Sequence, residues 1–92
     1  MEIQTKQDHT AQMQLVILAF GIAKDIVGGS QINFTIKEKA TVLELKKALL
    51  QQFPKFEKLV SLAIGVNGEY AEDGLVLKPS DEIVIIPPVS GG

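Results

Sequence analysis

The sequence predicts an α+β domain, in which a sheet is covered on one face by one main helix. Three patterns carry this prediction. Residues 14–20 and 83–86 are continuous apolar runs of strand length, residues 31–36 alternate apolar and polar side chains, and residues 42–52 place apolar side chains at helical spacings. The two apolar runs are typical of strands contacted on both faces, so we expect them in the centre of the sheet.

The first half of the chain is predicted to be a strand hairpin. Residues 14–20 form its first strand and residues 31–36 its second, with the apolar side chains of the second on one face. Residues 22–27 show no clean period and run into the turn cluster Gly28-Gly29-Ser30. We therefore expect an irregular linker between the two strands.

The main helix is predicted over residues 42–52. Thr41 precedes it and Glu44 follows three residues later, which is the spacing of a capping box. Phe53-Pro54 ends the helix, because a proline disfavours helical backbone at the residue before it. A connecting turn is expected over residues 55–59.

Three further strands are predicted after this turn. Residues 61–66 form the first, and Asn67-Gly68 is a tight-turn signal that reverses the chain into a short strand at Glu69-Tyr70. The second apolar run forms the last strand. Pro87-Pro88 ends it, because neither proline has a backbone N–H to donate to a ladder.

A single helix covers only one face of this sheet. By alternation, Val16, Leu18 and Phe20 share one face of the first strand, and Val84 and Ile86 share one face of the last. The pattern does not decide which set faces the helix. Two outcomes stay open for the second face: the linker and the turn cover it, or it is an apolar patch for a partner.

Composition excludes several classes of function. The 92 residues suffice for one small domain, and they include no cysteine and one histidine, His9. Thiol catalysis, zinc ribbons, a Ser-His-Asp triad and a metal site are therefore excluded, and we expect no independent enzyme of the usual kinds.

Charge and hydropathy exclude others. Nine lysines and no arginine face eleven acidic residues, giving a net charge of −2 and no basic patch for nucleic acid. No apolar run approaches the roughly 20 residues of a membrane span. The polar start, MEIQTKQDHT, lacks the apolar region of a secretory signal, so a cytoplasmic protein is expected.

Three segments are expected along the chain: a disordered polar extension over 1–12, the folded domain over 13–86 and an extended tail over 87–92. Six extended residues span about 20 Å, enough to enter a cleft of another protein. Gly91 and Gly92 have no side chains, so the end suits a narrow enzyme channel. The reactive group there is the α-carboxylate of Gly92, which becomes an acyl donor once activated as a mixed anhydride with a nucleotide phosphate.

The end of the chain carries a resemblance to a known family. The turn Ser80-Asp81-Glu82, the strand 83–86 and the ending Pro-Pro-Val-Ser-Gly-Gly resemble the small subunits of molybdopterin synthase. The resemblance covers about residues 13–92. It departs mildly in the first loop, where the family often has basic residues: this chain has no arginine there, although Lys24 stands in that loop. It implies a ubiquitin-like β-grasp fold, a mixed sheet with one main helix packed on one face.

The resemblance also implies a mechanism. An activating adenylyltransferase of the ubiquitin type would adenylate Gly92 with ATP, and sulfur would replace the adenylate to leave a thiocarboxylate. The tail would enter a pocket of the large subunit, which is catalytic, and give its sulfur to a cyclic pterin phosphate precursor of the molybdenum cofactor. The family implies a heterotetramer of two small and two large chains, with no cofactor bound to this one. The inserted tail residues would be Pro87, Pro88, Val89, Ser90 and Gly91.

In similar carriers an apolar patch beside the tail docks both partners. The matching positions here are Phe20, Tyr70 and Ile86. The alternative interpretation of each is that it is an ordinary core residue. Three charged residues would add ion pairs at the rim of the patch or are simply solvated: Lys24, Asp81 and Glu82.

Other functions stay open. The sulfur carrier for the thiazole of thiamin also ends in Gly-Gly, although Pro-Pro-Val-Ser before the glycines favours the molybdopterin carrier. A ubiquitin-like modifier would use the same tail chemistry with an amine of lysine in place of sulfide. A structural interaction domain would tolerate the loss of Gly92.

Overall fold

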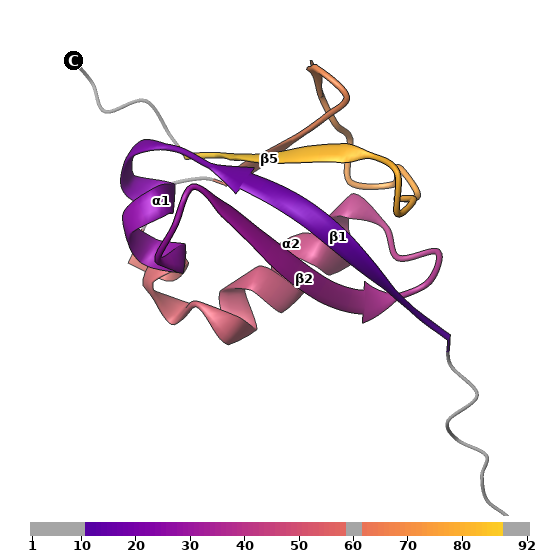
Figure 1. Cartoon of the computed structure of the whole chain (residues 1–92), viewed down its shortest axis with the longest axis horizontal. Helices are drawn as coiled ribbons and strands as arrows, with labels where there is room; N and C mark the ends of the chain where they lie inside the picture. The colour runs from indigo at the N-terminus through magenta and orange to yellow at the C-terminus, as the bar shows by residue number, and fades with distance from the viewer. Residues whose placement is uncertain (1–10, 59–61, 88–92) are drawn as a thin grey trace, which may run out of the picture.

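The computed structural model describes residues 11–58 and 62–87, which form one layer of sheet and one layer of helix (Figure 1). Residues 1–10, 59–61 and 88–92 lie outside the described part. In chain order the elements are β1 (Gln12–Ala19), α1 (Gly21–Val27), β2 (Gln31–Lys37), α2 (Val42–Gln52), the 3₁₀ helix η2 (Pro54–Lys58), β3 (Ala63–Val66), β4 (Glu69–Tyr70) and β5 (Glu82–Ile86).

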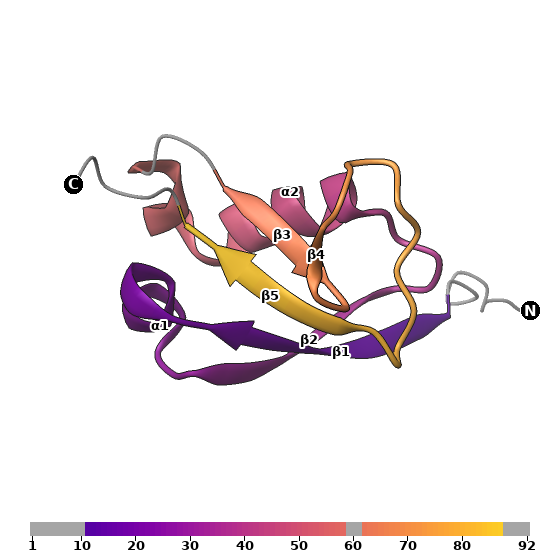
Figure 2. The ribbon, with the colours of Figure 1, turned by 90° about the horizontal axis from the view of Figure 1, so that it is seen from above.

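The five strands form a mixed sheet in the order β2-β1-β5-β3-β4. The central strands β1 and β5 run parallel, and every other pair is antiparallel. Figure 2 shows β5 between β1 and β3, with α2 on the far side of the sheet. The predicted fold class and the central position of the two apolar runs are confirmed.

The core lies between the sheet and α2. β1 and β5 contribute alternate side chains to it, and α2 contributes its apolar stripe. α1 and η2 add Ala23 and Phe56 to the same core, so both pack on the α2 side of the sheet. The fully buried large side chains are Phe56, Leu15, Ile17, Leu45, Leu49, Ile64, Leu77, Ile83, Ile85 and Val42.

Two predicted segments differ from the structure. Residues 22–27 are not an irregular linker, because α1 forms over Gly21–Val27 and ends at Gly28 in the left-handed region (φ 87°). This helix buries one side chain, Ala23, fully, so it shows no apolar period in the sequence. A turn is predicted over residues 55–59, but η2 forms over Pro54–Lys58 with Phe56 buried, and residue 59 lies outside the described residues.

None of the helices in the described ranges is long and apolar enough to cross a membrane.

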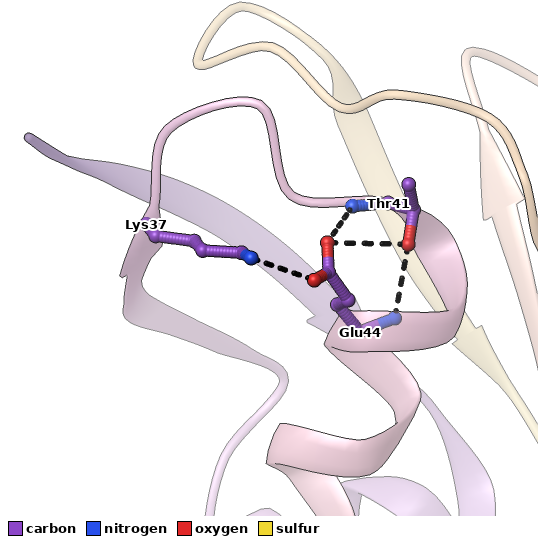
Figure 3. Close-up of polar contacts among 3 residues, drawn as sticks. All are labelled: Lys37, Thr41 and Glu44. Carbon is purple, nitrogen blue, oxygen red and sulfur yellow. Dashed lines mark hydrogen bonds and ion pairs between the residues drawn. The ribbon is translucent and has the colours of Figure 1, made fainter. Parts of the chain in front are cut away.

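The predicted capping box opens α2 (Figure 3). Thr41 Oγ1 accepts a hydrogen bond from the Glu44 N–H at 3.2 Å, and Glu44 Oε1 accepts one from the Thr41 N–H at 2.9 Å. Lys37 Nζ lies 2.7 Å from the second carboxylate oxygen of Glu44. The hydrogen bond from Lys37, and after it the one from the Thr41 backbone, lower the pKa of Glu44 below its ordinary value.

The free energy of unfolding is therefore expected to fall in acid, as Glu44 becomes protonated. The carboxylate is favoured in the folded chain, so its contribution is fully present above the pKa of the unfolded glutamate and is lost as the pH falls through the lower folded pKa. Urea unfolding of the wild type and of Glu44→Gln, which keeps the shape but not the charge, measures this. The wild type is more stable at neutral pH, and the two curves converge in acid. An unchanged difference at low pH would contradict the assignment.

Candidate functional site

The sheet face opposite α2 is apolar over its centre. We call it the open face, and its members on the central strands are the side chains that alternate with the buried ones. Phe20, which follows β1, is 57% exposed, and Tyr70 on β4 is 75% exposed. The hypothesis that the linker and the turn cover this face is wrong, because α1 and η2 lie on the other side. The open face consists of Val16, Leu18, Phe20, Tyr70, Val84 and Ile86.

Strand register brings these side chains together. Leu18 on β1 lies opposite Val84 on β5, Val84 lies opposite Gly65 on β3, and Gly65 lies opposite Tyr70 on β4. The four residues therefore form one row across the sheet. Beyond β1 the same face becomes polar, because β2 presents the exposed side chains of Gln31, Asn33 and Thr35 there, whereas Lys37 at the end of the strand reaches around to Glu44 on α2.

A hollow of about 230 Å³ lies on the open face beside Tyr70. Gly65 forms its floor, since a Cβ built there would stand 3.2 Å from Ile86 Cδ1 and 3.9 Å from Val84 Cβ. The remaining lining is apolar except for Glu69. The hollow can accept one apolar side chain of a partner, which is the usual form of an energetic anchor in an interface.

Phe20 occupies a position where the local rules favour a polar residue. It is the N-cap of α1, with extended backbone, and its carbonyl accepts the Ala23 N–H at 3.1 Å. Its side chain makes no capping hydrogen bond. Asn, Asp, Ser and Thr are the residues that stabilise an N-cap. An exposed phenylalanine at this place is therefore explained by an interaction outside the chain better than by folding.

Hydrogen bonds fix the turn that carries Tyr70. Asn67 and Gly68 have φ of 53° and 88°, the backbone of a two-residue hairpin turn. Asn67 Oδ1 accepts the Glu82 N–H at 2.9 Å, and Asn67 Nδ2 donates to Asp81 Oδ1 at 3.0 Å. Asp81 Oδ2 also accepts the Lys78 N–H at 2.9 Å. Both oxygens of Asp81 thus serve the local structure, which gives this residue a role that sequence reasoning missed.

The tail leaves the sheet at the end of β5. Pro87 is half-buried, and Pro88, Val89, Ser90, Gly91 and Gly92 lie outside the described residues. Ala19 at the end of β1 pairs with Ile85, so α1, which follows β1, lies at the end of the sheet where β5 ends (Figures 1 and 2). Lys24 is exposed on α1 and therefore lies at this end too.

The three residues predicted for the patch lie on the open face, where Phe20 and Tyr70 are exposed and Ile86 is half-buried. Phe20, Tyr70 and Ile86 share one accessible face and are not core, whereas their role in docking stays a prediction. Reasoning from the sequence missed Gly65, although a glycine inside an apolar strand signals a close approach of neighbouring atoms. Among the described residues, no three His, Cys, Asp or Glu side chains gather as a metal site would require.

Comparison with known proteins identifies relatives along most of the chain. A family model described as "ThiS family" matches residues 17–92. The molybdopterin synthase sulfur carrier subunit of Caenorhabditis elegans is 35% identical, covering 87% of this chain and 99% of the relative. The human subunit of the same name is 34% identical, covering 86% of this chain and 94% of the relative.

Solved structures agree with this relationship. A chain from the complex of subunits 1 and 2 of the molybdopterin-converting factor of Helicobacter pylori matches with 30% identity and a TM-score of 0.56, over 87% of this chain and all of that chain. The small archaeal modifier protein SAMP1 from Haloferax volcanii matches with 25% identity and a TM-score of 0.70, over 86% of this chain and 99% of that chain.

Removing the exposed phenylalanine should leave the fold intact. We expect Phe20→Asn to change the free energy of unfolding by less than about 0.5 kcal/mol or to raise it by up to about 1 kcal/mol, because a new capping hydrogen bond compensates for the missing ring. Phe56→Ala, at a buried phenylalanine, is the control and should cost about 3–5 kcal/mol. Urea unfolding measures both, and a loss of several kcal/mol in Phe20→Asn would show that this side chain is core.

Proposed function

Because the chain belongs to the ThiS family, we propose that its open face docks the protein on its partners while the tail presents a sulfur carried on Gly92. The chain is a sulfur carrier subunit of molybdopterin synthase in molybdenum cofactor biosynthesis and is not itself catalytic. The observation that carries the docking proposal is one of position. The exposed side chain of Phe20 and the half-buried side chain of Ile86 lie at the end of the sheet from which the tail departs.

The chemistry proposed for the tail needs no side chain of this protein. A carboxylate oxygen of Gly92 attacks the α-phosphate of ATP on the activating enzyme, and pyrophosphate leaves. A sulfide-equivalent nucleophile then attacks the acyl carbon, AMP leaves, and a thiocarboxylate remains. The tail, with Pro87 to Gly91 extended, carries this group into the pocket of the large subunit. ATP is consumed on the activating enzyme, so this chain binds no cofactor of its own.

The proposed partners are proteins. They are the large subunit, in a heterotetramer of two small and two large chains, and the activating adenylyltransferase. The solved Helicobacter pylori complex, which contains subunits 1 and 2 of that organism's factor, supports the first of these. A cytoplasmic location is proposed with them. Lys24 and Glu82 remain candidates for ion pairs at the rim of the open face, whereas the carboxylate of Asp81 is already engaged.

A modifier role is the second candidate, favoured by the likeness to the archaeal modifier protein. The two roles share the acyl adenylate and differ in the nucleophile that follows, a lysine amine in place of sulfide. The reaction products therefore distinguish the two roles, because a modifier becomes joined to other proteins through an isopeptide bond.

Intact-protein mass spectrometry tests the tail chemistry. After incubation with ATP, a sulfur source and the molybdopterin-type activating enzyme, we expect a mass shift equal to the exchange of one oxygen for sulfur. Deletion of Gly92, or addition of one residue after it, should abolish both the shift and the synthesis of molybdopterin while thermal unfolding is unchanged.

The other outcomes have defined meanings. A shift obtained only with the thiazole-pathway enzyme would move the assignment to thiamin, and lysine conjugates in place of the thiocarboxylate would move it to a modifier. Sulfur transfer by the chain lacking Gly92 would contradict the mechanism.

Binding to the large subunit tests the open face. We expect Phe20→Ala and Ile86→Asp each to weaken binding at least about tenfold, because a buried anchor at an interface contributes on the order of 2 kcal/mol. Leu75→Ala is the matched control, since Leu75 is also exposed (43%) but lies off this face, in the loop before β5. Calorimetric titration and thermal unfolding are measured together. A lower melting temperature with unchanged affinity would show that the two residues serve the fold.

A further inference from the structure

The strand β2 forms one edge of the sheet. About half of the backbone N–H and C=O groups of β2 therefore point away from the rest of the sheet. Two hydrogen bonds bracket its ladder with β1: Ala19 N–H to Ser30 O and Glu38 N–H to Ala11 O, each 2.9 Å. The register between them is uninterrupted, so the hydrogen-bonded positions alternate strictly. The backbone N–H and C=O groups that point outward therefore belong to Gln31, Asn33, Thr35 and Lys37.

This edge lacks the devices that usually block strand addition. Residues 31–37 contain no proline, the ladder shows no bulge, and seven residues is long for an exposed edge. The only charge on the strand is that of Lys37, and its ammonium is engaged with Glu44 at 2.7 Å. Within the described ranges, no other strand of the sheet pairs with this edge. An edge of this kind is a template for another strand.

The residue pattern of β2 is symmetric about its centre. Reading outward from Phe34, the flanking residues are Asn33 and Thr35, then two isoleucines, then Gln31 and Lys37. Small polar residues therefore lie opposite small polar ones, isoleucine lies opposite isoleucine, and a long polar side chain lies opposite another when the strand pairs with itself in the antiparallel sense. Such self-complementarity is what a two-fold interface requires, because both surfaces are the same.

We propose that β2 pairs edge to edge with β2 of a second copy of this chain, antiparallel, about a two-fold axis at Phe34. In this register Asn33 lies opposite Thr35 of the second copy, and Gln31 lies opposite Lys37. All four outward-facing residues of each strand then exchange backbone hydrogen bonds. Registers centred on Asn33 or Thr35 satisfy fewer of them or place Lys37 opposite residues outside the symmetric pattern.

Electrostatics and burial favour a second copy on this edge. No two like charges face each other in the register, since each Lys37 lies at the opposite end of the strand pair from its counterpart. A groove of about 430 Å³ between β2 and α2 is lined by Phe34, Thr35, Ala48, Gln51 and Gln52, without a charged side chain. A second strand at its rim therefore removes apolar surface from water and leaves no charge desolvated.

The pairing leaves the carrier functions accessible. β2 and β4 are opposite edges of the sheet, so Tyr70 stays free, and β5 keeps its neighbours and its end. A symmetric sheet of two copies therefore exposes two open faces on one side.

Sedimentation of the full chain from micromolar to millimolar concentration tests the proposal. The test variant is a proline substitution that removes only an N–H on the outer edge of β2. The Thr35 N–H points outward, so Thr35→Pro removes no bond to β1 and takes two hydrogen bonds from each dimer. We expect a reversible monomer–dimer equilibrium whose dissociation constant rises at least about tenfold in Thr35→Pro. Thr35→Ala, which keeps the N–H, should stay within about twofold of the wild type. A chain that is monomeric at millimolar concentration, or a dimer indifferent to Thr35→Pro, would overturn the proposal.

Two double variants at the exposed positions 33 and 35 test the register, because they place either like or opposite charges across the strand pair. N33K/T35K places lysine opposite lysine in the Phe34-centred register and should abolish the dimer, whereas N33D/T35K places opposite charges together and should keep it. Thermal unfolding of both variants checks that the monomer stays folded. A dimer that persists in N33K/T35K, or one lost equally in both variants, would refute the register.

Discussion

The parallel pairing of β1 with β5 is the constraint on which the rest of the structure depends. Ile17 and Ala19 on β1 lie opposite Ile83 and Ile85 on β5, and all four side chains point toward α2. Because the strands are parallel, the intervening chain has to cross over, and α2 makes that crossing on one face. Parallel direction also makes the two strands end together. Phe20 and the start of the tail are thereby brought to the same end of the sheet.

The same pairing determines that an apolar face is left open. Both central strands are apolar at every position over residues 15–19 and 83–86, but one helical layer can cover only one side. In the described part of the chain, α1, α2 and η2 all pack on the same side of the sheet. Exposed Phe20 and Tyr70 therefore cost free energy in the isolated chain, and the proposed docking would recover it as apolar area is removed from water. Phe20 at an N-cap shows the same conflict at a single residue, since a polar cap would serve the helix better.

Local patterns predicted the elements that depend on local physics. The capping box, the Asn67-Gly68 turn and the alternation of residues 31–36 were readable because each depends on residues a few positions apart. α1 was not readable, since a helix that buries only Ala23 fully leaves no periodic signal. The side of the sheet that faces α2 was undecided for a related reason. Strand alternation defines two faces, and only packing against the helix distinguishes them.

The candidate site residues also fall into two groups: those that the sequence predicted and those that depend on contacts formed only in the folded chain. Phe20, Tyr70 and Ile86 were found as members of one patch, partly from alternation and partly from the family resemblance. Gly65 was missed because a hollow depends on which atoms approach a glycine across two strands. Asp81 was assigned to the rim, yet its two oxygens bind Asn67 and the backbone of Lys78, partners that only the folded chain brings together.

The two surfaces of the sheet act through separate elements. Docking uses β5, β4 and the end of β1, whereas self-pairing uses the outer edge of β2, with β1 as the rigid element between them. Neither interaction changes the backbone groups or side chains that the other needs. The coupling free energy between them is therefore expected to be near zero, so a paired carrier binds its large subunit as tightly as a single one. Because the two β2 strands are antiparallel, the two β5 strands also run in opposite directions, and the tails leave at opposite ends. In a carrier pair of this geometry the two Pro87 residues, from which the tails start, lie at opposite ends of the joined sheet, which favours two separate partners over one shared pocket.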